Sequence, residues 1–160
     1  MRVLWVEIFR LQAEERIRDL VRSRGLRDVY KGKTVLSGLY SHDDPVDGVC
    51  DVIDGMRVAL DRDGRLEDSS LGVVALETWD SSDAIRSACA EAFSGLESAF
   101  RDSMIRGGID RDRAEDLGVT IEALIEGAIM LSLTQRTSAP LKAVRRSVVV
   151  LVDDARGVDG

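Results

Sequence analysis

Hydrophobic residues recur every three or four positions along most of this chain, which is the spacing of helices that bury one face. A first helix is predicted from Leu4 to Ser23, with Gly25 as its end. A second begins at Asp44-Pro45, where an aspartate N-cap precedes a proline at the first helical position, and ends at Asp63-Gly64. Residues 26–41, between these two helices, show no regular period.

Two further helices are predicted in the middle of the chain. The apolar segment Leu71 to Trp79 favours a short buried helix, although Val73-Val74 would also suit a strand. Asp80 to Asp83 is a capping cluster, and the helix after it has an apolar stripe from Ile85 to Met104 before Gly107-Gly108 ends it. These patterns predict an all-α fold.

The last two predicted helices, Asp112 to Gln135 and Ser138 to Asp154, carry more apolar residues than one buried face needs. Val119, Met130 and Leu131 lie outside the main stripe of the first of them. Because excess apolar surface on two adjacent helices usually docks on a second copy, we expect a homodimer. A buried strand over 148–154 is an alternative, but its neighbours are helices and no glycine-rich loop follows it.

The composition is that of a folded domain with an uneven charge. The 160 residues are 44% hydrophobic and 32% charged, enough for one core, and the net charge of -7 argues against a surface generally adapted to polyanions. Residues 1–41 hold nine Lys and Arg against five Asp and Glu, whereas residues 42–160 hold 13 against 24. We therefore divide the chain into a basic N-terminal segment, 1–41, with one helix and an irregular part, and an acidic helical domain, 42–160.

Candidate catalytic and metal-binding groups are sparse. His42 is the only histidine, so His-rich metal sites are excluded, and we interpret it as a solvated loop residue. Capping explains the acids of Asp43 to Asp47 better than a cation site does. Glu122 and Glu126 lie one helical turn apart, and we interpret both as solvated or interface residues. No catalytic residue, metal site or cofactor is predicted, and the chain is not expected to be an enzyme.

The cysteines and the hydropathy indicate an ordinary intracellular protein. Cys50 and Cys89 fall within helical patterns, where a reduced cysteine serves as a small apolar residue. The run Val3 to Phe9 is interrupted by Glu7 and makes a poor signal peptide. No segment approaches the ~20 apolar residues that a membrane span needs. We expect a cytoplasmic protein without membrane contact.

Five stretches of the helical domain follow one another in a recognisable order and spacing. They are Asp44-Pro45-Val46, Leu71 to Glu77, Ile85 to Met104 with Phe93, Leu124 to Leu131, and Pro140-Leu141. In this order they resemble the C-terminal ligand-binding and dimerisation domain of TetR/AcrR-type transcriptional regulators, particularly the LmrA/YxaF-like branch. Where that branch usually has Gly-Cys-Pro, this chain has Ser69-Ser70-Leu71.

The resemblance implies that the last two helices pack on their counterparts in a four-helix homodimer bundle. The preceding helices would enclose a pocket for a small apolar ligand. Dimer contacts are expected from eight apolar residues: Ile121, Ile125, Ala128, Leu131, Leu141, Val144, Val148 and Leu151. Ligand contacts are expected from five large side chains: Met56, Trp79, Phe93, Phe100 and Met104.

The helix-turn-helix head of this family is not found intact here. Arg24-Gly25 resembles the end of its first helix and Gly38 to His42 its recognition helix, but only 13 residues, Leu26 to Gly38, separate the two. We interpret residues 1–41 as a remnant or linker of such a head. Either the head is shortened, or Leu4 to Ser23 is the connecting helix that follows an absent head, and we favour the absent head. Contacts to DNA would come from Lys31, Lys33 and Tyr40.

We therefore expect a TetR-like regulator body that homodimerises and binds a small apolar effector. The alternative is a non-DNA-binding module, a truncated relative that pairs with a full-length regulator or only binds ligand.

Overall fold

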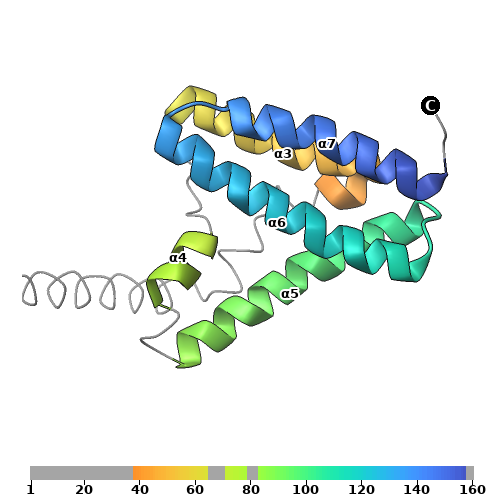
Figure 1. Ribbon diagram of the computed structural model, residues 1–160, viewed down its shortest axis with the longest axis horizontal. Coiled ribbons are helices and arrows are strands. Elements are labelled where there is room, and N and C mark those ends of the chain that lie inside the picture. Colours follow the sequence, from red (N-terminus) through yellow and green to blue (C-terminus); the bar gives the residue numbers. More distant parts are fainter. Residues whose placement is uncertain (1–37, 65–70, 79–82, 158–160) are drawn as a thin grey trace, which may run out of the picture.

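The computed structural model describes residues 38–64, 71–78 and 83–157, and the structural statements that follow concern these residues. They form α3 (Pro45–Asp63), α4 (Leu71–Thr78), α5 (Asp83–Arg106), α6 (Arg111–Gln135) and α7 (Ala139–Arg156), preceded by a helical turn at 38–41 (Figure 1). No strand occurs in these ranges. The all-α prediction is confirmed, and the strand alternatives at 73–74 and 148–154 are wrong.

The predicted helix from Leu4 to Ser23 lies outside the described residues, as do Lys31, Lys33 and Trp79. Most of the capping cluster before α5, residues 80–82, lies outside them too.

Capping residues end the helices where the sequence indicates. The Asp44 carboxylate accepts a 2.8 Å hydrogen bond from the Val46 amide at the start of α3, and Gly64 ends that helix with a φ of 64°. Asp110 caps α6 in the same way, accepting a 2.9 Å bond from the amide of Asp112. The far end of α6 is unusual because Arg136, not a glycine, takes the left-handed conformation, with a φ of 53°.

The helices pack in two groups. α3 and α7 lie side by side with α6 against α7, while α5 packs along α6 and reaches α3 near its C-terminal end (Figure 1). The short α4 contacts both α5 and α6. Two arginines of α7 join it to α3, since Arg156 binds the Asp44 carboxylate at 2.8 Å and Arg145 binds Asp54 at 2.8 Å.

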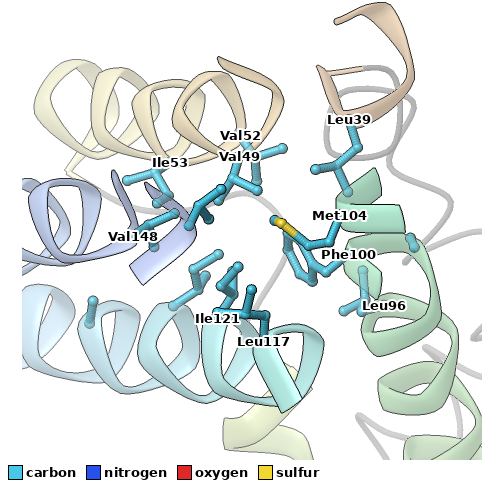
Figure 2. Packing of buried hydrophobic residues seen from close by; sticks show 14 of the residues in the cluster. Leu39, Val49, Val52, Ile53, Leu96, Phe100, Met104, Leu117, Ile121 and Val148 are labelled. Atoms are coloured by element: carbon cyan, nitrogen blue, oxygen red, sulfur yellow. The ribbon is translucent and has the colours of Figure 1, made fainter. Parts of the chain in front are cut away.

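The core lies where α3, α5, α6 and α7 meet. Phe100 and Met104 of α5 gather there with Val49 of α3 and Ile121 of α6 (Figure 2). Leu39, from the turn at 38–41, is fully buried in the same cluster. The turn that precedes α3 is therefore packed onto the helical domain rather than set apart from it.

Candidate functional site

The contact between α5 and α6 is closest at Gly118. A Cβ atom at this position would lie 2.8 Å from the Glu97 carbonyl oxygen of α5, which only a glycine avoids. From this crossing the two helices diverge, and α4 lies between their separated ends (Figure 1). The amide of Gly72 in the first turn of α4 donates a 3.2 Å hydrogen bond to Glu126 of α6.

We call this region the α4–α5–α6 junction. It is defined by Leu71 and Gly72 of α4, Phe93 and Glu97 of α5, and Glu122 and Glu126 of α6.

Glu122 is the most unusual side chain of the junction. It is only 6% exposed, and no side-chain donor within the described residues meets either of its carboxyl oxygens. Burial, together with the nearby carboxylates of Glu97 and Glu126, raises its pKa to about 8, although the backbone of Glu97 acts in the opposite direction. At neutral pH this carboxyl group is therefore protonated in most molecules of the ligand-free protein.

The sequence interpretation of Glu122 as a solvated or interface residue is wrong. Gly118, Glu122, Ile125 and Ile129 are spaced four, three and four residues apart, and all are buried on one side of α6. This spacing was the available signal. It was missed because a glutamate beside a second glutamate is normally found on a solvated face.

The predicted ligand residues do not all reach the junction. Phe100 and Met104 are buried in the central core, where each residue is less than 3% exposed. Phe93 is half-buried, one helical turn before Glu97 on the same side of α5. Met56 of α3 packs at the edge of the core.

The predicted dimer residues fall into two groups. Leu131 is 51% exposed, and Val144 and Leu151 are partly buried against the core. The other five are enclosed by the chain's own helices: Ile121, Ile125, Ala128, Leu141 and Val148.

Large apolar side chains nevertheless remain on the outside of α6 and α7. Of the seven large hydrophobic residues described as exposed, four lie on these two helices: Val119, Met130, Leu131 and Val150. They share one side of each helix with exposed small residues such as Ala123 and Ala143. We call this surface the α6–α7 face.

Polar contacts fasten the turn at 38–41 to the helical domain. The Arg106 guanidinium donates a 2.9 Å hydrogen bond to the Leu39 carbonyl and lies 5.0 Å from the centre of the Tyr40 ring. His42 is not simply solvated as expected, because its Nε2 atom lies 2.5 Å from the Asp51 carboxylate of α3. Tyr40, one of the predicted DNA contacts, is exposed at this surface.

Two other properties of the described residues concern possible partners. They contain no group of three or more His, Cys, Asp or Glu side chains placed to hold a metal ion. By length and composition α6 is apolar enough to cross a membrane, contrary to the sequence expectation. The core helix of a soluble protein passes the same criterion, so α6 is weak support for a membrane span.

The helical arrangement and the sequence place this chain in a known class. Residues 45–147 match the family of LmrA/YxaF-like transcriptional regulators, C-terminal domain, and the chain belongs to this branch of the TetR family. This confirms the resemblance seen in the sequence.

Two regulators of Bacillus subtilis strain 168 are among its relatives. The chain is 31% identical over 109 residues to the uncharacterized HTH-type transcriptional regulator YxaF, covering 68% of this chain and 57% of YxaF. It is also 31% identical over 98 residues to the HTH-type transcriptional regulator LmrA, covering 61% of this chain and 52% of LmrA. The chain thus spans little more than half the length of the relatives that it matches.

Proposed function

We propose that this chain is the body of a cytoplasmic transcriptional regulator that homodimerises through the α6–α7 face and binds a small apolar effector at the α4–α5–α6 junction. The observation that carries the proposal is the concentration of exposed apolar side chains on α6 and α7, the two helices expected to form the dimer. Leu131 and Val150, 51% and 67% exposed, would be covered by a second copy.

Small residues on the α6–α7 face favour close packing of helices. Ala123 and Gly127 of α6 and Ala143 and Ser147 of α7 lie on the outward sides of these helices. Short side chains allow helix axes to approach closely, while larger neighbours such as Met130 fill the space between them. The five predicted residues that are already buried would support this face from beneath.

The effector site is proposed at the junction because α4 is attached to the rest of the bundle less extensively than the other described helices are. α4 is short, and its main contacts are with α5 and α6. By contrast, α3 and α7 are joined by two arginine–carboxylate pairs. An element with few buried contacts opens at lower free-energy cost than the rest of the bundle. Phe93, half-buried on α5, would provide the apolar contact.

A neutral fluorescent dye tests the effector site. Nile red should bind the full chain saturably, and Phe93→Ala should weaken that binding about tenfold, since loss of one buried aromatic contact costs on the order of 1–2 kcal/mol. Val58→Ala is the matched control, because Val58 is an exposed apolar residue of α3 away from the junction. Saturable binding that both variants weaken equally, or no binding at all, would refute this site.

Regulation of transcription is proposed from the relatives, which are HTH-type regulators. A gel shift with the DNA upstream of the chain's own gene should show binding that falls steeply as salt rises. If no DNA is bound at low salt while the dimer and dye binding are intact, the chain is instead a ligand-binding module that does not read DNA. Co-purification with a full-length regulator would then identify it as a heterodimer partner.

A further inference from the structure

Glu122 lacks the pairing that other carboxylates of the domain have. Asp44 and Asp54 are both more exposed, yet each binds an arginine at 2.8 Å, Arg156 and Arg145 respectively. Glu122 is 94% buried and meets no side-chain donor among the described residues. A buried carboxyl group without a partner is unfavourable, and more so when it is ionised.

Among the residues that the structure describes, the groups around Glu122 do not supply a positive charge to pair with it. From α5 it faces Glu97, and on α6 the nearest charged side chain is Glu126, one turn further along. Arg101 of α5 lies beside Gly118, but its guanidinium binds Asp102 at 2.9 Å instead. The α4 side chains that the structure describes are uncharged.

We propose that the Glu122 carboxylate binds the cationic group of the effector, so that the effector is an organic cation with an apolar body, such as a tertiary amine or a quaternary ammonium compound. This inference rests on the proposed effector site at the junction and assigns the chemical class of its ligand. An isolated buried carboxylate gains most from a cation that brings little hydration of its own, which favours an alkylated ammonium over a hydrated metal ion.

The aromatic ring of Phe93 suits the same ligand. Phe93 and Glu97 are one turn apart on α5, and Glu97 is close enough to Glu122 to act on its charge. An ammonium group between a carboxylate and an aromatic face gains from both the charge and the ring quadrupole. The apolar part of the ligand would then lie against α4, where Leu71 is buried.

Binding of such a cation is coupled to a proton. In the ligand-free protein the carboxyl is protonated at neutral pH, since its pKa is about 8. When the cation binds, the carboxyl O–H bond breaks, both electrons stay on the oxygen and the proton passes to the buffer. Affinity for the cation should therefore rise with pH until about pH 8 and then level off. A neutral ligand that accepts a hydrogen bond from the protonated carboxyl would show the opposite trend.

The test compares aryl-alkyl-trimethylammonium salts with neutral isosteres in which a carbon atom replaces the nitrogen. Isothermal titration of the full chain should show the cations binding at least tenfold more tightly than their isosteres. Repeating the titration in phosphate and in ACES, two buffers that work at pH 6.5 and differ in ionisation enthalpy, should show release of up to about one proton per bound cation at that pH. Release should approach zero above pH 9.

Glu122→Gln should lower the affinity for the cations at least tenfold and abolish proton release, while leaving the isosteres unaffected. Glu115→Gln is the matched control, because Glu115 is exposed on the same helix and should change nothing. Since glutamine is neutral, as the protonated carboxyl group is, and similar to it in size, the variant should fold.

Four results would overturn the inference. Equal affinity for cation and isostere, or full cation affinity in Glu122→Gln, refutes the role of the carboxylate while leaving the effector site in place. Binding of isosteres alone refutes the cationic class. Failure of every probe, Nile red included, refutes the proposed effector site itself.

Discussion

At the scale of single residues, Glu122 links the packing of α6 to pH. Its pKa in the folded chain is about 8, against 4.5 for an ordinary glutamate, so between these values the folded protein holds a proton that the unfolded chain has released. A group of this kind contributes stability that is fully present below about pH 4.5 and is lost as the pH rises toward 8. Each unit of such a shift corresponds to roughly 1.4 kcal/mol.

Glu122→Gln should remove this pH dependence. Between pH 5 and pH 8 the free energy of unfolding of the variant should rise relative to that of the parent by a few kcal/mol in all, since burial of the ionised form is avoided. Urea unfolding at both pH values, at one protein concentration, measures it. A difference between the two proteins that does not change with pH would contradict the assignment.

The burial of Glu122 also shows where the sequence was misleading. The helix boundaries were predictable because Asp44, Asp110 and Gly64 act locally, within one turn of chain. Which side of α6 is buried depends on α5, whose contact at Gly118 is set by packing between helices. The left-handed conformation of Arg136 could not be predicted either, because an arginine side chain does not favour that conformation.

At the scale of the elements, the crossing of α5 and α6 depends on the absence of one side chain. Glycine within a helix is unfavourable by about 1 kcal/mol relative to alanine. Gly118 is nevertheless required, because the Glu97 carbonyl and the Arg101 amide occupy the space that a Cβ would take, at 2.8 and 3.3 Å. Backbone atoms cannot rotate aside as a flexible side chain does.

Gly118→Ala should therefore destabilise the protein by about 1–2 kcal/mol, since the strain of overpacking exceeds the gain in helix propensity. Gly95→Ala is the matched control, because Gly95 lies in α5 with no atom within 4 Å of an added Cβ. It should stabilise the protein by about 0.5–1 kcal/mol. Thermal unfolding in parallel compares the two, and stabilisation of both variants would show that the helices are not in close contact at Gly118.

At the scale of the whole molecule, the proposed homodimer forms through the α6–α7 face. Leu131 and Val150 of this face are both exposed, whereas a charge at the buried Val148 would enter the core of a single chain and unfold it. The excess of apolar residues on these helices was visible in the sequence. Which of these residues stay exposed could not be predicted, because several of the expected dimer contacts are buried by packing within the chain.

The double variant Leu131→Glu, Val150→Glu should be monomeric, because two unpaired charges would be buried in each half of the proposed interface. Light scattering coupled to size exclusion measures the mass. Val58→Glu, which places the same charge on an exposed apolar residue of α3, should leave the dimer intact. A double variant that stays dimeric would exclude this face as the interface.

The glycine crossing has a mechanical consequence for the long helix α5. At 1.5 Å per residue, the helix extends about 21 Å on the Asp83 side of Glu97 and about 14 Å on the Arg106 side. Because Arg106 is hydrogen-bonded to the Leu39 carbonyl, the shorter arm holds the turn at 38–41, while Phe93 lies on the longer arm. With Gly118 as a fulcrum, a tilt that moves the far end of the longer arm by 1 Å would move the shorter arm by about two thirds of that distance in the opposite direction. The two arms of α5 would thus move in opposite directions, and the turn at 38–41 that precedes α3 is attached to the shorter arm.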